Sequence, residues 1–333
     1  MKKAITIIIC LALTISIFAL PASAVSIPAG SFGNYEHVFI IGIDGAGRFI
    51  RNANTPNFVR IFKTGSVTYT ARAEIKTDSG PNWGAILTGA SIIKTGLQNG
   101  VTGEQERSSD TEFPTIFTFA RREYPDAELA SFVNWNNINY GIIENDIGVN
   151  KVNIPDDEKL TDAICDYLDA GNAPKLMFVQ LDSVDHEGHS HGSKSREFLD
   201  QINTVDGYVG RIYDSLVDND LADSSLFIVV ADHGHTVKGG HGGLTMRETN
   251  VTFAVVGKSV CRCVKMDESA RNRDVAAVAL YALGIERPET MTSRVPANVF
   301  VDVKGQDRPI FRDPIDALLS LVLWEITLLT AWF

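Results

Sequence analysis

The sequence predicts an α/β fold, a three-layer sandwich in which a mostly parallel central sheet is flanked by helices. Short apolar runs rich in β-branched residues alternate along the chain with longer runs whose apolar residues recur at helical spacing. Such alternation is typical of a parallel sheet with crossover helices. The short runs are also apolar at consecutive positions, which indicates strands that are covered on both faces.

Five strands are expected, with helices between them. The strand segments are 37–44, 128–135, 175–184, 224–234 and 250–257. The helical segments are 55–65, 111–124, 157–171, 196–216 and 271–284, the last of which ends in a glycine, as helices often do. In open sheets of this kind, ligands bind beyond the carboxyl ends of the strands, so polar residues at those ends are of special interest.

The composition is that of an ordinary globular protein. Of the 333 residues, 44% are hydrophobic and 21% are charged, so a sizeable core can form. The formal net charge is −11, and such an acidic chain makes a poor nucleic-acid clamp. The 4 cysteines lack zinc-finger spacing, and we expect no disulfide framework.

The two ends of the chain differ from the middle. Residues 1–24 combine two lysines, an apolar stretch and a small-x-small site that ends at Ala24, which predicts a cleaved signal peptide and an exported protein, whether periplasmic, secreted or on the outer membrane face. An uncleaved membrane anchor is the alternative. Residues 306–333 form an apolar tail, for which we expect a helix lying on the membrane surface or in the groove of a partner.

Histidines are concentrated in two short runs. Six of the 7 histidines fall in VDHEGHSHG (184–192) and ADHGHTVKGGHGG (231–243), each expected to be a loop after a strand. The acidic and imidazole side chains that these strand ends and the first strand would present are Asp44, Asp185, His189, Asp232, His233 and His241.

These six side chains favour a metal site when they are taken together. Taken singly, Asp44 is compatible with capping a turn, and His233 with a hydrogen-bonded core histidine. Imidazole and carboxylate groups together suit zinc or manganese. Six ligands exceed the need of one tetrahedral ion, so we expect two divalent metal ions, with zinc favoured over manganese.

Ser79 is the candidate nucleophile. It precedes Pro81, which suits the first turn of a helix, and an apolar run follows. A serine at a helix N-terminus lies beside backbone N–H groups that attract anions, and Asn82 adds a side-chain donor. The alternative role for Ser79 is an ordinary helix N-cap.

The order of the motifs IGIDGAG, SGPNWGAILTG, DHEGH, ADHG and HGG resembles the alkaline phosphatase superfamily, most closely its branch of type I phosphodiesterases and nucleotide pyrophosphatases. The resemblance extends over residues 36–300 and implies an alkaline phosphatase-like catalytic domain over 25–305. Because the connection between 128–135 and 175–184 is short compared with relatives that carry a large cap, a minimal cap domain or none is expected.

The resemblance implies a role for each motif residue. Ser79 matches the nucleophile, and Asn82 matches a donor to phosphate oxygens. The implied ligands of one ion are Asp44, Ser79, Asp232 and His233, and those of the other are Asp185, His189 and His241. Residues between the motif positions are expected beside the ligands or in solvent, and they are Asp182, His186, Glu187, His191 and His235.

The sequence therefore predicts an exported metal-dependent hydrolase of small phosphate esters that acts through a covalent phosphoserine at Ser79. Asn82 and the apolar Trp83 favour diesters over monoesters. Three alternatives share much of the motif pattern: a phosphonate hydrolase, a phosphomutase of the same superfamily, and a non-catalytic binding protein with structural metals. The export signal disfavours the mutase, and a serine beside the ions disfavours a closed structural site.

Overall fold

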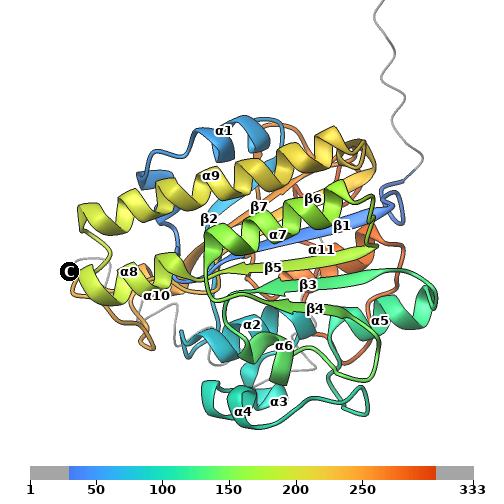
Figure 1. The fold of residues 1–333 in the computed structure, drawn as a ribbon, viewed down its shortest axis with the longest axis horizontal. Helices are drawn as coiled ribbons and strands as arrows, with labels where there is room; N and C mark the ends of the chain where they lie inside the picture. The colour runs from blue at the N-terminus through green and yellow to red at the C-terminus, as the bar shows by residue number, and fades with distance from the viewer. Residues whose placement is uncertain (1–29, 305–333) are drawn as a thin grey trace, which may run out of the picture.

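The computed structural model describes residues 30–304, which form one sheet with helices on both faces (Figure 1). The eight strands follow the spatial order β4-β3-β5-β1-β6-β7-β2-β8. Their bounds are β1 His37–Ile43, β2 Ser66–Arg72, β3 Leu129–Val133, β4 Asn150–Asn153, β5 Leu176–Leu181, β6 Ser225–Val230, β7 Asn250–Val256 and β8 Val264–Lys265. Only β7 runs antiparallel to its neighbours, so the expected mostly parallel sheet is confirmed.

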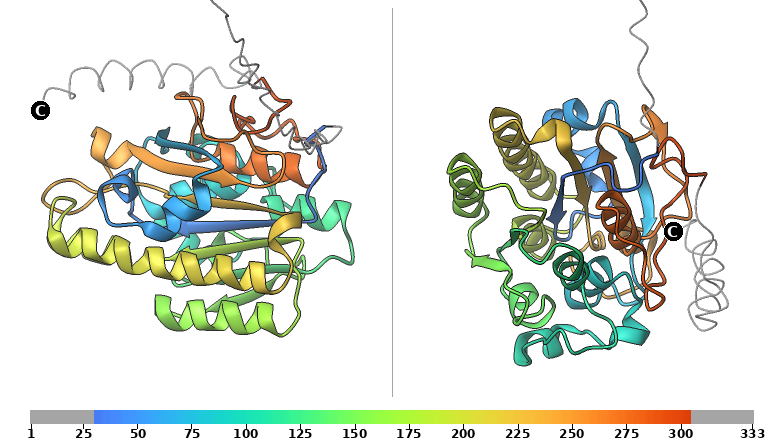
Figure 2. Two further views of the ribbon diagram at one scale, coloured as in Figure 1. Left: turned by 90° about the horizontal axis from the view of Figure 1, so that it is seen from above. Right: turned by 90° about the vertical axis from the view of Figure 1, so that its right-hand side faces the viewer.

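Helices cover the sheet in two layers. One layer contains α1 (Pro56–Phe62), α7 (Asp157–Asp169), α8 (Ser183–His191) and α9 (Arg196–Asp218). The other contains α2 (Ser79–Thr88), α5 (Ile116–Glu123) and α11 (Asp274–Ala282). Figure 2 shows the sheet between these layers, and the three-layer expectation is confirmed without a cap domain in the described part of the chain.

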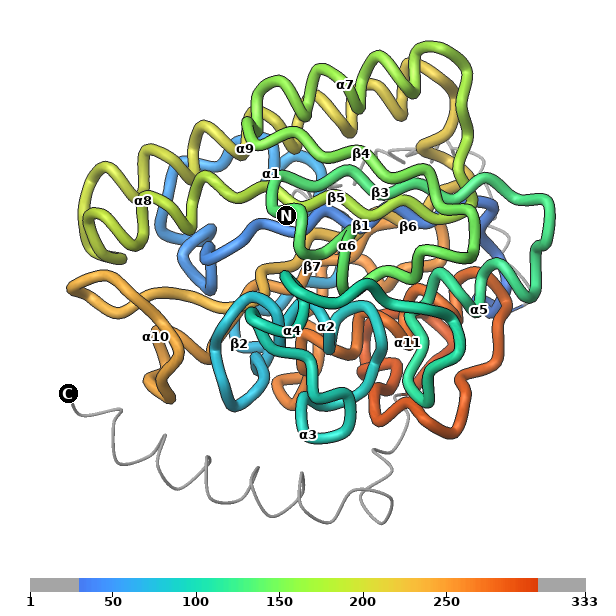
Figure 3. Tube along the Cα trace, turned by 60° about the horizontal axis from the view of Figure 1, so that its bottom comes forward, coloured from blue at the N-terminus to red at the C-terminus, as the bar shows by residue number. Residues whose placement is uncertain are grey.

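The remaining helices are short. Their bounds are α3 Ile92–Thr95, α4 Asn99–Glu104, α6 Asn137–Gly141, α10 Met246–Thr249 and the two 3-10 helices η1 Phe49–Asn52 and η2 Ala222–Ser224. Figure 3 shows α3 and α4 beside α2, at the edge of the molecule that faces the viewer. These short helices therefore flank the segment that carries the expected nucleophile.

All five expected strands are present, although each ends earlier than expected, β5 and β6 by the most residues. The strands β5 and β6 end at Leu181 and Val230, because the chain turns there into the polar segments that follow. Three further strands were not expected: β2 and β4 carry polar or half-exposed residues, and β8 has only two residues. Pairing with neighbours, rather than an apolar pattern, defines these three strands.

The expectation of a loop at 184–192 was wrong, because this segment forms the helix α8. The helix begins at Ser183, directly after β5, and packs against α9. Histidine and glycine are weak helix formers, so tertiary packing overrides the local preference. The helix places Asp185 and His189, one turn apart, on the same face.

The central strands bring their carboxyl ends to one edge of the sheet. The strand β1 lies between β5 and β6, with Gly42 opposite both Gln180 and Val230. All residues of β5 and β6 are buried, as their apolar sequences require. The chain therefore leaves these three strands at the same level, and the segments that follow them meet.

The two ends of the chain lie outside the described residues. The expected signal peptide (1–24) and the apolar tail (306–333) are among the segments to which no structure is assigned. Between residues 30 and 304, none of the helices combines the length and the apolar character needed to cross a bilayer.

We predict that Asp206 stabilises the fold by capping α1 from α9. The N-cap residue Thr55 makes no capping hydrogen bond, whereas the Asp206 carboxylate accepts from the backbone N–H groups of Asn57 (2.9 Å) and Phe58 (2.7 Å). Asp206→Ala leaves these donors unpaired and should lower the free energy of unfolding by about 2 kcal/mol in urea titrations.

Asp214→Ala is the matched control for this prediction, because Asp214 lies on the same helix and pairs with Arg60 at the surface (2.7 Å). An exposed ion pair contributes little, so the control should stay within about 0.5 kcal/mol of the wild type. Equal stabilities for the two variants would contradict the capping role.

Candidate metal centre and nucleophile

One cluster of side chains surrounds His233, just beyond the carboxyl ends of β1 and β6. His233 Nε2 lies 3.5 Å from Asp44 Oδ1, 3.3 Å from Asp232 Oδ2 and 3.2 Å from Ser79 Oγ. Ser79 Oγ also lies 3.4 Å from Asp44 Oδ1. Asp44, Asp232 and His233 are almost completely buried. The four residues that the sequence assigned to one ion therefore meet in space.

Neighbouring residues fix the orientation of Asp44. Its Oδ2 atom accepts hydrogen bonds from Trp83 Nε1 (2.8 Å) and Gln180 Nε2 (2.9 Å). The other oxygen, Oδ1, is the one that faces His233 and Ser79. The carboxylate thus presents one oxygen to the cluster, while the second oxygen is held by the protein.

Asp232 is held in the same manner. Its Oδ1 atom accepts from the backbone N–H groups of Gly45 (3.0 Å) and His233 (2.7 Å). Its Oδ2 atom is buried and has no hydrogen-bond partner among the described residues. An unpaired buried carboxylate oxygen is costly, which indicates a ligand at this position.

A second cluster contains Asp185, His189 and His241. His189 Nε2 lies 3.3 Å from Asp185 Oδ2 and 3.0 Å from His241 Nε2, and His241 Nε2 lies 3.6 Å from Asp185 Oδ1. Their ligand atoms lie within 4.8 Å of one another. His233 Nε2 is 4.0 Å from Asp185 Oδ1, and the rings of His233 and His241 stack at 3.9 Å, so the two clusters adjoin.

Backbone carbonyls set the tautomers of the two histidines in the glycine-rich segment. His241 Nδ1 lies 2.7 Å from the carbonyl oxygen of Thr77, and His233 Nδ1 lies 3.3 Å from that of Gly234. Each contact requires a proton on Nδ1, which leaves the lone pair on Nε2 facing the cluster. Metal-binding histidines are commonly oriented in this way.

Thr77 connects the glycine-rich loop to the nucleophile segment. Besides the bond from His241, its Oγ1 donates to the carbonyl of Gly243 and accepts from the N–H of Gly242 (both 2.9 Å). Gly242 has φ +100°, and a Cβ there would lie 3.0 Å from Asp78 Oδ1, so this turn requires glycine.

The electrostatics of the buried cluster indicate a missing positive charge. Burial, together with the carboxylates of Asp232 and Asp185, raises the pKa of Asp44 well above its usual range. Burial likewise raises the pKa of Asp232. Burial and the neighbouring His241 lower the pKa of His233, which keeps its imidazole neutral. Among residues 30–304, Asp44 and Asp232 pair with the neutral His233 and with no lysine or arginine, so their charge is not offset.

The residues present fit divalent cations. The buried oxygen of Asp232 lacks a partner, and the lone pairs of His233 and His241 point into the clusters. His189 Nε2 and His241 Nε2 face each other at 3.0 Å, a distance that requires a shared proton or a cation. Nitrogen and carboxylate donors of this kind suit zinc and manganese. The assignment of individual ligands stays a prediction.

Ser79 is the first residue of α2, and Asp78 occupies the N-cap position. The Ser79 hydroxyl therefore does not cap the helix. It contacts Asp44 and His233 instead. The N-terminal amides of α2 were expected to bind phosphate oxygens, but the N–H of Gly80 already donates to Asn99 Oδ1 (2.7 Å) and Pro81 has none. The helix end alone thus offers few donors.

Asn82 does not face the site, contrary to the expectation that it binds a phosphate oxygen. Its Nδ2 donates to the carbonyls of Lys76 (2.9 Å) and Asp78 (2.8 Å), and its Oδ1 accepts from the N–H of Glu74 and from Asn272 (both 2.8 Å). The side chain is fully buried, and all four hydrogen bonds are used within the protein. Asn82 therefore fixes the turn that carries Ser79.

Asn99, which the sequence did not single out, contacts the residue next to Ser79. Its Oδ1 accepts from Gly80, next to Ser79, and the residue is exposed at the start of α4. An amide held by its oxygen presents its Nδ2 donor to solvent beside the nucleophile. No local motif distinguishes this asparagine from others, and only the folding of α4 against α2 reveals it (Figure 3).

The residues expected beside the ligands or in solvent differ in their exposure. His186 and His191 are exposed on α8, and His191 pairs with Glu187 at 3.4 Å. Burial and the neighbouring Asp185 raise the pKa of Asp182 to about 6. His235, in contrast, is completely buried against the second cluster.

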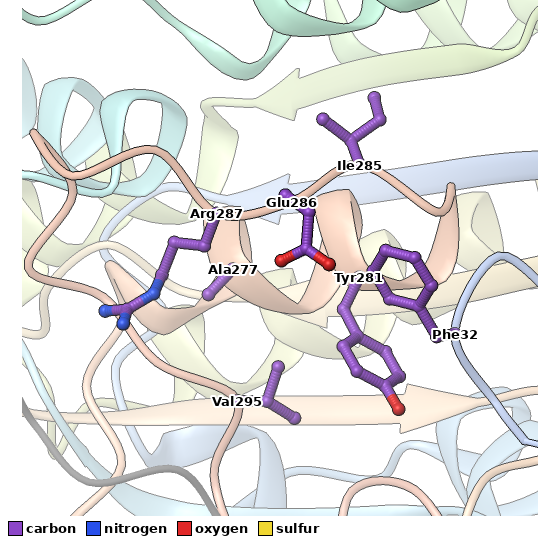
Figure 4. Close-up of a pocket in the computed structure, with 7 residues that line it drawn as sticks. All are labelled: Phe32, Ala277, Tyr281, Ile285, Glu286, Arg287 and Val295. Carbon is purple, nitrogen blue, oxygen red and sulfur yellow. The ribbon is translucent and has the colours of Figure 1, made fainter.

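A cavity of about 360 Å³ lies away from these clusters, beside α11 (Figure 4). Phe32, Tyr281 and Ile285 line it, together with the charged residues Glu286 and Arg287. Phe32 precedes β1, so this cavity adjoins the edge of the sheet where that strand begins, opposite to the histidines. It contains no histidine or aspartate and offers no comparable chemistry.

The fold and the convergent site define a phosphoester-acting enzyme of the alkaline phosphatase superfamily. Residues 38–241, more than half of the chain, match the family model of type I phosphodiesterase/nucleotide pyrophosphatase. The chain belongs to this family.

Solved structures and curated relatives are consistent with this membership. Murine ectonucleotide pyrophosphatase/phosphodiesterase 5 has a similar fold, with a TM-score of 0.62 at 14% identity over 76% of this chain and 96% of that chain. A 2-O GAG sulfatase has a TM-score of 0.60 at 13% identity over 78% of this chain and 73% of that one. At these identities the likeness concerns the fold alone.

The curated relatives are GPI ethanolamine phosphate transferases. Transferase 3 of Schizosaccharomyces pombe is 37% identical over 32% of this chain, and transferase 1 of Candida glabrata is 26% identical over 45%. These matches cover 11% and 18% of the relatives' own length, so the chain spans less than a fifth of those proteins.

We predict that His189→Ala lowers the metal content of the purified protein from two ions to about one, because it removes one of the three donors of the second cluster. Metal is measured by inductively coupled plasma analysis after dialysis. His191→Ala, on the same helix, is the control and should leave the metal content unchanged, since His191 contacts Glu187. Equal metal content in both variants would disprove the second ion site.

Proposed function

We propose that this protein is an exported, metal-dependent hydrolase of phosphate esters that acts through a covalent phosphoserine at Ser79. The observation that carries the proposal is the position of Ser79 Oγ, 3.2 Å from His233 Nε2 and 3.4 Å from Asp44 Oδ1. A hydroxyl at the meeting point of such donors is suited to nucleophilic attack, whereas a structural metal site needs no such group.

Bound divalent ions would supply Lewis acidity, which lowers the pKa of a hydroxyl and neutralises charge on phosphate oxygens. Zinc is the proposed ion. The residues that would hold one ion are Asp44, Asp232 and His233, with Ser79 beside them, and those that would hold the other are Asp185, His189 and His241. Both sets agree with the groups of donor atoms that lie within 4.8 Å of one another.

In the first step, Ser79 Oγ forms a bond to phosphorus while the ester bond to the leaving alcohol breaks, and the departing oxygen takes up the proton that Ser79 loses. Ser79 is held in place at the N-terminus of α2, because the four hydrogen bonds of Asn82 fix the preceding turn. We assign to Asn99 the donor role first expected of Asn82, since its amide lies beside Gly80.

In the second step, a water molecule attacks the phosphoserine, the bond from Ser79 Oγ to phosphorus breaks, and the serine regains a proton. Water reaches this region from the side of His189, whose side chain is 51% exposed. Asp44 and Asp232 lie on the opposite, buried side. Ser79 itself is buried, so the attacking water would approach it from the exposed side.

Ser79→Ala is expected to abolish turnover of nitrophenyl phosphodiesters while both ions remain bound, because six other donors stay in place. Activity is measured by nitrophenol release, and metal by inductively coupled plasma analysis. In the wild type, acid quenching during turnover should trap the retained phosphoryl group on the peptide that contains Ser79, as detected by mass spectrometry. Retention of more than a few per cent of the wild-type activity would exclude the covalent mechanism.

Transfer to an alcohol is the second candidate function, and the names of the curated relatives favour it. A transferase would use the same phosphoserine but pass the phosphoryl group to a hydroxyl acceptor rather than to water. The two activities differ only in the second step, so the fate of the phosphoryl group distinguishes them.

For a hydrolase, the nitrophenol and phosphomonoester released from a nitrophenyl phosphodiester should remain in equal amounts when a hydroxyl acceptor such as glycerol is added at increasing concentrations. A transferase would form a new diester, and the monoester would fall below the nitrophenol. Phosphorus NMR of the products measures this ratio. We expect equality, because His189 and Asn99 are exposed and would admit water to the site.

Export and the role of the apolar tail are further parts of the proposal. The segment 1–24 supports export, and the tail at 306–333 is proposed to contact a membrane surface or the groove of a partner. The substrate is proposed to be a small phosphate ester rather than a nucleic acid, given the net charge of −11.

A further inference from the structure

His235 is a buried histidine that the sequence expected either beside the ligands or in solvent. Its side chain is completely inaccessible, and its Nε2 lies 2.9 Å from Asp185 Oδ1. Asp185 is one of the residues proposed to hold the second ion. The contact joins two segments that are fifty residues apart in the sequence.

The packing around His235 fixes the ring. A Cβ at Gly45 would lie 2.7 Å from His235 Nε2, and a Cβ at Gly188 would lie 2.3 Å from its Cδ2. Phe198 contacts the ring edge-on, with centroids 6.0 Å apart. Glycines on two sides allow this approach, so the ring has little freedom to turn.

Geometry separates His235 from the proposed ligands of the second ion. Among the described residues, donor atoms within 4.8 Å of one another group His235 with Asp185 and His233, but not with His189 or His241. His235 Nε2 bonds to Oδ1 of Asp185, the oxygen that also lies 3.6 Å from His241 Nε2. Its hydrogen bond to Oδ1 leaves Oδ2 facing His189, at 3.3 Å.

The direction of the hydrogen bond follows from the chemistry of the two groups. An ionised carboxylate only accepts, so Nε2 of His235 carries the proton. Its Nδ1 is buried and has no partner among the described residues, which leaves the Nε2 contact as the polar interaction of this ring. A buried side chain with one directed hydrogen bond is suited to holding its partner in place.

We propose that His235 is a positioning residue, which holds the Asp185 carboxylate in the orientation that binds the second metal ion. The inference rests on the proposed function, because it presumes that Asp185 is a metal ligand. Loss of such supporting hydrogen bonds typically weakens metal binding by about 10- to 100-fold.

Two substitutions of similar size test the proposal. In His235→Gln the side-chain amide can donate to Asp185 in place of Nε2, whereas His235→Met fills the same space without a donor. Zinc affinity is measured by competition with a chromophoric chelator, stoichiometry by inductively coupled plasma analysis, and folding by urea titration. His191→Met, at an exposed position on α8, is the control.

The Met variant should bind two ions at saturating zinc, with the affinity of one site reduced by about 10- to 100-fold, and its activity should recover as zinc is added. The Gln variant should bind zinc within about threefold of the wild type. Equal affinities in the Met and Gln variants would overturn the proposal. So would the loss of one ion at saturating zinc in both variants, because His235 would then be a ligand.

The wild type separates this proposal from the proposed function. If the unaltered protein does not bind two ions, the two-ion site itself is wrong. If it binds two ions and the Met variant does so with unchanged affinity, only the role of His235 is wrong.

Discussion

The packing of β1 between β5 and β6 is the constraint on which the site depends. Their ends lie at one level, so Asp44, Asp185 and Asp232 are delivered to the same edge of the sheet. Burial and mutual repulsion make this arrangement unfavourable without a compensating cation, as the raised pKa values of Asp44 and Asp232 indicate. The cluster therefore lowers the folding stability of the metal-free protein, and bound metal would stabilise it.

A network of neutral amides and an indole holds this cluster together. Trp83 and Gln180 fix Asp44, and Asn272 donates both to Asn82 and to the carbonyl of Asp232 (2.8 and 3.0 Å). Asn272 thus joins α2, which carries Ser79, to the segment that carries Asp232 and His233. Neutral donors orient carboxylates without cancelling their charge, so the cluster keeps its attraction for cations.

The sequence predicted the elements that are apolar and the residues that motifs mark, but not the direction of every side chain. The strands β1, β5 and β6 were evident because both faces are buried, whereas β8 exists only through pairing with β2. Motif spacing placed Asn82 beside the nucleophile, yet its amide turns into the protein. Sequence alone also could not distinguish the buried His235 from the exposed His191, because both histidines lie between motif positions.

The two clusters differ in depth, and this difference suits a two-step reaction. Asp44, Asp232 and His233 lie in the interior, where Ser79 is held on the rigid start of α2. His189 lies at the surface, on the helix α8, which packs against α9. In the proposed mechanism, a substrate would approach from the side of His189 and would meet Ser79 at the buried end of the site. The buried side would then position the attacking group, and the exposed side would admit substrate and water.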